Sequence, residues 1–599
     1  MNASKNETSE RPLSQKHQSG RITLPMKPFL VFVPILTIVC TVGSTILGGP
    51  LIYLYFYPEK QTVYTDFLNR YVIQGLTLLL PNVSLRLTVS ETYNISIAAC
   101  IISIIVSLLS VRLLLSVYYS VQLNMPHVPE RLPYLGNVQD FLTTSPWDLM
   151  THWHSLYGPI YSFTLLGRNC VSIAHPGYLR TMLQGKVRSS KKDVKFAYQT
   201  FLSILGTGIV TSEGESWKSQ RLSVSSVLRH DVLEVIPGIT LRAVQRLCQL
   251  LDNAEKEHKV VDLSEELRHL TLQVISELFF SLSAKESDET FAKMYLPIME
   301  ESHRRLWHPE LKYAFFLPSF WKNIRNVNSL NSYVSSLILN RWAQRRQQDY
   351  KPSHDDLLER VLTFYERKKG LAPLSRRDVC QLRDEMKTFV LAGHETSAAM
   401  MTWAFYEILS KTADAERLLS KVKEEAASVF GKHSDWCSSN ITENDLPPAE
   451  ELSKLVISEA VLKESLRKYS VVPVVSRIVV EEMELGPHTI PPGTSVFISI
   501  QGVHHDPEIW KNPKVFDPVS RFVDPAPIPA PYTFLPFLEG PRNCLGQYLA
   551  LLESKIVLSL LVYTYNFDFV GCWDGIDPKH RYVVPVIPKN GCHVRVSRV

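Results

Sequence analysis

The sequence has little net charge and no closely paired cysteines. Its 64 basic and 59 acidic residues leave a formal charge of +5 over 599 residues, so nucleic acid is not favoured as the main partner. The nine cysteines occur singly, without the C-x-x-C pairs that build zinc or redox sites. We therefore expect no disulfide scaffold, and a reducing compartment in which a special cysteine acts alone as a thiolate.

Charged residues are absent from two long stretches near the N-terminus. Residues 28–58 carry none, and this run exceeds the roughly 20 residues that a helix needs to cross a bilayer. Residues 92–111 also carry none, and Arg112 follows them. We expect transmembrane helices at 29–57 and 92–123. The alternatives are a cleaved signal peptide for the first stretch and a buried core helix for the second.

The charges around these runs predict how the chain crosses the membrane. The charged residues of the tail, residues 1–28, are mostly basic, with acids only at Glu7 and Glu10. This charge bias favours a cytoplasmic N-terminus. Two spans then return the chain to the cytoplasm and leave residues 58–91 in the lumen. The triplet Asn82-Val83-Ser84 in that segment is a glycan acceptor.

The rest of the chain reads as a hinge and one large body. Residues 124–137 contain three prolines, which predicts a proline-rich hinge that is a stiff connector. The body follows over 138–599. Strands are expected at 160–166 and 171–174, helices over most of 215–470, and short strands within 471–540. A helix begins after the capping Ser375, runs to about 409 without proline and is about 50 Å long. The fold class is mainly α with a small β portion; the only low-information stretch is a polar loop near 430–450.

The strongest motif is FLEGPRNCLG, near the C-terminus. It places Phe537, Gly540, Arg542, Cys544 and Gly546 in the spacing F-x-x-G-x-R-x-C-x-G. A single cysteine anion can be the axial ligand of haem iron. The glycines let backbone N–H groups approach the sulfur, and a guanidinium suits a haem propionate. The rival interpretation of the cysteine is a buried structural thiol.

With this motif the chain resembles the cytochrome P-450 family, and the long helix strengthens the resemblance. Gly393, Glu395 and Thr396 match the family's A-G-x-[DE]-T. The resemblance implies that this segment lies over the haem, where the acid and the alcohol relay protons to bound dioxygen. A mid-helix glycine costs about 1 kcal/mol against alanine, which suggests a close ligand or a local opening of the helix. A threonine after it can bond to the backbone.

Two further pairs fit the same family. Trp217 and Arg221 match W-x-x-x-R, whose side chains reach the haem propionates by resemblance; Arg477 resembles a further propionate partner, or is a plain strand arginine. Glu464 and Arg467 match E-x-x-R and share a helix face. By resemblance Arg521 completes this second group, although its segment, FDPVSRF, departs from the family's P-E-R-F spacing. We assign that group to stability.

The resemblance implies a chemistry and a set of partners. It implies haem b held by Cys544, and a monooxygenase acting with dioxygen on a lipophilic fatty acid, carotenoid, terpenoid or sterol. The chain has no P-loop and no dinucleotide-binding motif, so electrons are expected from NADPH-cytochrome P-450 reductase, with cytochrome b5 as an optional donor. The expected location is the endoplasmic reticulum membrane, with a cytosolic catalytic domain. The alternatives are an isomerase or peroxide-rearranging enzyme of the same fold, and a non-enzymatic haem carrier.

Overall fold

The computed structural model describes Ile105 and residues 123–599 with short gaps. The gaps are 133–134, 186–188, 229, 309–310, 312, 348–349, 352–355, 432, 434, 439, 524, 526–527, 571–579 and 582. The predicted N-terminal tail, first membrane helix and glycan site therefore lie outside the described residues, as does nearly all of the second membrane helix.

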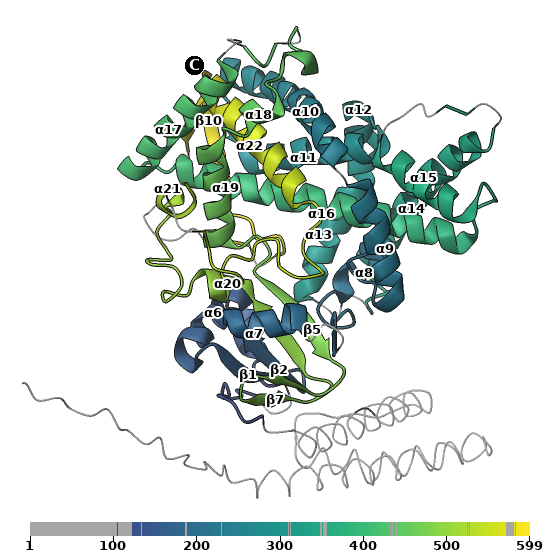
Figure 1. Cartoon of the computed structure of the whole chain (residues 1–599), viewed down its shortest axis with the longest axis vertical. Coiled ribbons are helices and arrows are strands. Elements are labelled where there is room, and N and C mark those ends of the chain that lie inside the picture. The colour runs from purple at the N-terminus through teal and green to yellow at the C-terminus, as the bar shows by residue number, and fades with distance from the viewer. Residues whose placement is uncertain are drawn as a thin grey trace, which may run out of the picture. The chain divides into compact units, whose positions relative to one another are not determined.

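Helices make up most of the described chain (Figure 1). In chain order they are α5 (Val138–Thr143), α6 (Pro146–Tyr157), α7 (Pro176–Arg180), α8 (Leu202–Leu205), α9 (Gly214–Val227), α10 (His230–Lys256), α11 (Leu263–Phe280), α12 (Ala284–Glu286), α13 (Lys293–Trp307), α14 (Pro318–Arg345), α15 (Leu357–Lys369), α16 (Arg376–Ile408), α17 (Ala413–Phe430), α18 (Ala449–Leu452), α19 (Val456–Tyr469), α20 (Ile500–His504), α21 (Pro518–Phe522) and α22 (Gln547–Thr564). Shorter turns are η3 (Thr181–Gly185), η4 (Gln199–Phe201), η5 (Ser287–Ala292) and η7 (Glu443–Asp445). The mainly helical prediction is confirmed.

The strands form three small sheets. The largest has the order β1 (Ile160–Leu165), β2 (Arg168–Ile173), β8 (Ser495–Ser499), β5 (Val474–Val479), β3 (Ser190–Lys191). β2 and β8 are parallel, and its other pairs are antiparallel. A second sheet joins β4 (Val261–Asp262), β10 (His593–Arg598) and β9 (Tyr565–Phe569), and β6 (Met483–Leu485) pairs with β7 (His488–Ile490). The strands expected at 160–166 and 171–174 are confirmed as β1 and β2.

The long helix α16 lies at the centre of the largest hydrophobic core. Ser375 caps it: its hydroxyl accepts the Asp378 N–H, and the Asp378 carboxylate accepts the Ser375 N–H. The predicted helix after Ser375 is therefore confirmed. Most of its residues beyond 382 are buried, and α11, α14, α19 and α22 pack against it. No break interrupts it at Gly393, so the local opening considered above is not present.

The proline-rich connector is attached to the sheet. The backbone of Ser162 in β1 donates to the Pro126 carbonyl and accepts the N–H of Val128. A proline lacks an N–H but keeps a carbonyl that can accept. This part of the connector therefore runs beside β1 and is hydrogen-bonded to it.

One helix within the described residues is apolar and long enough to span a bilayer. This is α22, and 72% of its 18-residue window is buried inside the protein. Its neighbours are α10, α17, α19 and α16, so it is a core helix.

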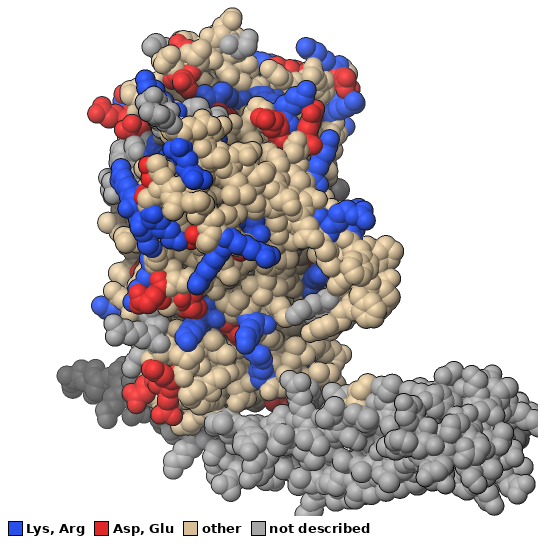
Figure 2. Space-filling model, turned by 90° about the vertical axis from the view of Figure 1, so that its right-hand side faces the viewer, with Lys and Arg blue, Asp and Glu red and all other residues tan. Residues whose placement is uncertain are grey.

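On the face shown in Figure 2, Lys and Arg form separate groups, with Asp and Glu groups and broad uncharged areas between them.

The prediction that the cysteines act singly is wrong for one pair. Cys248 on α10 and Cys437, in the loop after α17, form a disulfide across a sequence separation of 189 residues. Spacing along the chain could not reveal it, because a disulfide requires proximity of the two Cα atoms in the fold, here 5.7 Å. Cys170, Cys380, Cys544 and Cys592 are free among the described residues.

Candidate functional site

The loop before α22 holds Cys544 in a fixed conformation. The Cys544 N–H donates to the Phe537 carbonyl at 2.8 Å. Gly540 has φ +83°, and a Cβ there would lie 2.6 Å from the backbone oxygen of Leu183. The glycine is therefore required by a positive φ and by close approach of η3, a different reason from the access to sulfur expected from the sequence. Gly546 does serve the sulfur, since its N–H donates to Cys544.

Cys544 combines exposure with an enclosed environment. Its side chain is exposed, yet burial raises the pKa of the thiol, while the Gly546 N–H and the charge of Arg221 act in the opposite direction. Cys544 is therefore accessible although neighbouring protein atoms partly desolvate its thiol. The free cysteines Cys170 and Cys592, in contrast, are buried among core residues, so the structural-thiol interpretation fits them better than Cys544.

The α16 segment also faces open space at one point. Ala392 is exposed in the middle of this otherwise buried stretch, and Thr396, one turn later, is half-buried. The Thr396 hydroxyl donates to the Ala392 carbonyl at 2.5 Å. At Gly393 a Cβ would lie 2.4 Å from Ile275 Cδ1, so this glycine allows α11 to approach α16. A close ligand is not needed to explain it.

Glu395 is turned away from Thr396, toward α11. Arg268 Nη2 lies 2.9 Å from Glu395 Oε1, and His394 Nδ1 lies 3.5 Å from the same oxygen. Burial opposes ionisation, but His394 and Arg268 outweigh it and hold the pKa of the Glu395 carboxyl below its usual value. Burial lowers the pKa of His394 to about 4. Sequence reasoning missed Arg268, because no local motif connects it to α16.

A basic cluster lies around the loop of Cys544. Arg542 pairs with Glu213, and its guanidinium lies 4.2 Å from the centre of the Trp217 ring. Arg221 donates to the backbone oxygen and the side-chain oxygen of Asn543. These contacts bring together three residues predicted from two distant motifs.

Two further cations belong to this cluster. Arg477 on β5 is buried and donates to the Ser476 carbonyl. Lys192, directly after β3, was not predicted; its Nζ donates to the Ile209 and Val210 carbonyls at 3.4 and 2.7 Å. Burial and the charges of the three arginines lower the pKa of Lys192 to about 7. In the sequence it is the second of two adjacent lysines, and it belongs to none of the motifs described above.

The residues present fit a haem group. Four cations face one paired carboxylate, Glu213, within the described residues, and Arg542 Nη1 is buried without a hydrogen-bond partner. A ligand with two carboxylates would supply the missing acceptors. An exposed sulfur near this cluster supplies an iron ligand. Among the described residues no group of three or more His, Cys, Asp or Glu could hold a metal ion.

The predicted stability group comes together on α19. Arg467 donates through Nε and Nη2 to both Glu464 oxygens at 2.8 Å, and both side chains are fully buried. Arg521 also pairs with Glu464 and donates to the Val515 carbonyl at 2.8 Å. The altered spacing of its segment therefore still delivers Arg521 to Glu464.

Comparison with known proteins gives a consistent result. The family model described as Cytochrome P450 matches residues 126–591. The chain is 28% identical over 463 residues to cytochrome P450 4c21 of Blattella germanica, covering 74% of this chain and 88% of that protein. It is 31% identical over 409 residues to a cytokinin hydroxylase of Arabidopsis thaliana, covering 65% and 72%. The crystal structure of the cytochrome P450DA heme domain superposes with a TM-score of 0.66 at 20% identity, covering 79% of this chain and 98% of that chain, which shows the fold.

Proposed function

Since the chain belongs to the cytochrome P450 family and is a haem-thiolate monooxygenase, we propose that Cys544 ligates the haem iron and that the enzyme hydroxylates or epoxidises a lipophilic substrate. The observation that carries this assignment is that Cys544 is an accessible free cysteine whose sulfur accepts a hydrogen bond from the Gly546 N–H. Trp217, Arg221, Arg477, Arg542 and Lys192 would hold the propionates. The haem, when bound, supplies the activation of dioxygen.

On α16, Thr396 and Glu395 would transfer protons. The Thr396 Oγ1 donates to the Ala392 carbonyl, which fixes its orientation and leaves its lone pairs able to accept a hydrogen bond from a proton donor. Glu395 is bound to Arg268 on α11. To pass a proton to Thr396, its side chain has to rotate away from Arg268. Arg268 would thus set how often the carboxylate is available.

The N-terminal sequence and the relatives support a substrate class and a set of partners. The predicted membrane helices at 29–57 and 92–123 favour a membrane-bound enzyme that takes lipophilic molecules from the bilayer. The relatives include a cytokinin hydroxylase and a protein named for lutein deficiency, which supports hydroxylation and leaves a broad substrate range. Family membership implies a redox partner; we propose an NADPH-dependent reductase, with cytochrome b5 as an optional donor, in the endoplasmic reticulum membrane.

The ligand assignment is tested by Cys544→Ala in the full-length chain. We expect loss of the red-shifted absorbance of the ferrous carbon monoxide complex, because no sulfur ligand remains. Cys380→Ala, at a free half-buried cysteine of α16, should keep it. A normal carbon monoxide spectrum in Cys544→Ala would exclude this ligand.

The reaction type is tested by Thr396→Ala with reductase, NADPH and a lipid extract. We expect unchanged haem content, at least about tenfold less oxygenated product per NADPH, and more hydrogen peroxide. Thr402→Ala is the matched control, since Thr402 makes the same bond to a carbonyl four residues earlier on the same helix. NADPH-independent turnover of a hydroperoxide, with no oxygen consumption by either protein, would favour the peroxide-rearranging alternative.

A further inference from the structure

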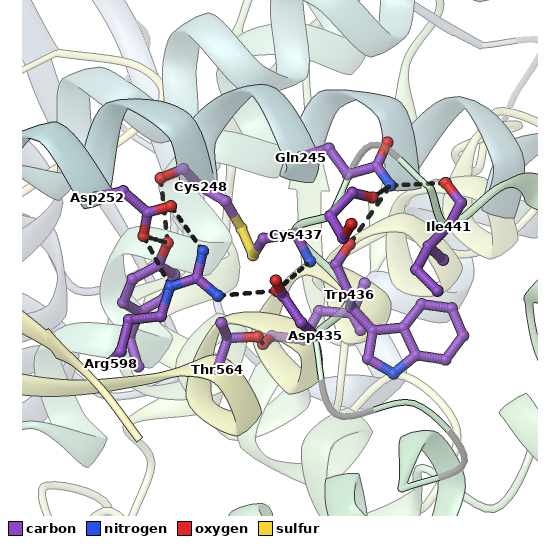
Figure 3. The surroundings of a disulfide bond; sticks show 12 residues. Gln245, Cys248, Asp252, Asp435, Trp436, Cys437, Ile441, Thr564 and Arg598 are labelled. Atoms are coloured by element: carbon purple, nitrogen blue, oxygen red, sulfur yellow. Dashed lines mark hydrogen bonds and ion pairs between the residues drawn. A yellow bond between two sulfur atoms is a disulfide. The ribbon is translucent and has the colours of Figure 1, made fainter.

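The loop that joins α17 to α18 lies along α10 as a strap, defined here as residues 435–438 and 440–448. Gln245 on α10 donates through Nε2 to three of its carbonyl oxygens, those of Trp436, Ser438 and Ile441, at 3.4, 3.1 and 2.9 Å. Trp436 is fully buried and its ring N–H donates to the Phe430 carbonyl. A stretch that reads as a polar loop in the sequence is therefore fixed to a helix (Figure 3).

The C-terminal strand fastens the same strap from another side. Arg598 on β10 pairs with Asp252 of α10 at 2.6 Å and with Asp435 of the strap at 2.7 Å (Figure 3). The side-chain oxygen of Asp435 also accepts the N–H of Cys437. Arg598 and Gln245 hold the strap by polar contacts that need no covalent bond.

The Cys248–Cys437 disulfide lies between these two polar contacts (Figure 3). Cys248 is fully buried on α10, whereas Cys437 is 8% exposed on the strap. Gln245 and Arg598 would keep the strap near α10 after reduction, so the two thiols would stay close enough to pair again, whereas the covalent bond limits wider movement of the strap. The pair is therefore arranged to form the bond again after reduction, and Cys437 is the sulfur nearer to solvent.

The strap also forms one wall of a cavity. Its end, with Leu446, Pro447 and Pro448, lines a cavity of about 1150 Å³ together with residues of α10 and α11. At the same wall, Glu443 pairs with Arg242 at 2.7 Å. Its carboxylate lies against Gly238, where a Cβ would come within 2.8 Å of Glu443 Oε2. Movement of the strap would open this wall.

We propose that Cys248 and Cys437 are a reversible redox pair that locks the strap onto α10, and that reduction loosens the cavity wall. With hydrogen peroxide as oxidant, one thiolate attacks the peroxide, the O–O bond breaks, and a sulfenic acid and water form. The second thiol then displaces the sulfenic oxygen as another water, and the S–S bond forms. Two thiols and one peroxide thus give one disulfide and two waters. With a small thiol as reductant, one thiolate attacks the disulfide to give a mixed disulfide, and a second releases the second protein thiol, so two small thiols become one small disulfide. This proposal is independent of the proposed function.

Differential labelling of the full-length chain tests the pair. Peroxide-treated protein is blocked with N-ethylmaleimide, reduced with a phosphine, and labelled with a second, isotopically heavy maleimide before peptide mass spectrometry. We expect the heavy label on Cys248 and Cys437, and the light label on Cys380 and the other accessible free cysteines. Light label on Cys248 and Cys437 after peroxide treatment would overturn the proposal.

Hydrogen exchange tests the lock itself. Reduction of the wild-type protein should speed exchange in residues 440–448 by at least about tenfold and lower Tm by about 2–5 °C. Cys437→Ser should show the fast exchange with no further response to the phosphine, and Cys380→Ser should respond as the wild type does. Equal exchange in oxidised and reduced wild-type protein would refute the lock, and this comparison does not depend on any variant folding.

Discussion

Two arginine clusters in this protein look alike in the sequence and differ in the structure. Around Glu464, the two arginines Arg467 and Arg521 find acceptors on a fully buried carboxylate and on the backbone carbonyls of the following loop. Around the Cys544 loop, Arg542 pairs with Glu213, whereas Arg221, Arg477 and Lys192 donate to uncharged oxygens, and Arg542 keeps a buried N–H without a partner among the described residues.

The difference separates a structural network from a binding site. A buried network that is satisfied internally holds its elements together and has no unused hydrogen-bonding capacity for a ligand. A cluster with surplus positive charge and an unpaired donor costs free energy until an anion arrives. Charge balance and hydrogen-bond satisfaction therefore support the proposal that the Glu464 group stabilises the fold and that the Arg542 group binds an anionic ligand.

Removing Glu464 should have the largest effect on this comparison. Glu464→Ala leaves the fully buried Arg467 without its carboxylate, which is expected to destabilise the protein by about 3–5 kcal/mol or prevent folding. Thermal unfolding and the yield of folded protein measure this loss. Glu459→Gln is the control on the same helix; Glu459 is itself partly exposed and pairs with the partly exposed Lys463 and the buried Lys555, so a change of about 1 kcal/mol or less is expected. Equal losses in the two variants would remove the distinction.

Removing Arg542 should affect haem retention more than stability. Arg542→Ala takes away a charged donor to a propionate, and haem should dissociate about 10- to 100-fold faster. Transfer of haem to excess apomyoglobin measures this rate. Arg542→Lys should recover part of the effect, because the charge remains without the planar fork. Arg417→Ala, an exposed arginine on α17, should leave the rate unchanged. A large loss of stability with normal haem retention would place Arg542 with the structural network.

Local patterns in the sequence predicted a large part of this fold. The cap at Ser375 fixes where α16 begins, and the strands expected at 160–166 and 171–174 correspond to β1 and β2. The motif around Cys544 marked the segment in which this cysteine is held directly before α22. These features depend on residues close in sequence, where propensity, capping and turn geometry act directly.

What the sequence could not reveal depends on contacts between distant segments. Arg268 reaches Glu395 from another helix, and Cys248 meets Cys437 across 189 residues. At two motif glycines the physical reasons differ from those expected. Gly393 admits Ile275, and Gly540 admits the backbone at Leu183. Tertiary packing decides such contacts, and no local pattern encodes them.

The pH dependence of haem binding gives the finest distinction between the two clusters. Burial and neighbouring arginines lower the pKa of Lys192 to about 7, and an anionic propionate beside it would raise that pKa. Binding then takes up a proton between about pH 7 and 10, so haem affinity should fall with rising pH by at most about tenfold per pH unit and stay level below pH 7. Lys192→Arg keeps its charge throughout this range and should give a flat profile, and Lys192→Met a flat profile at lower affinity. Equal slopes in wild type and Lys192→Met would show that Lys192 does not face the haem, because a group that carries the pH dependence must abolish it when replaced by an uncharged side chain.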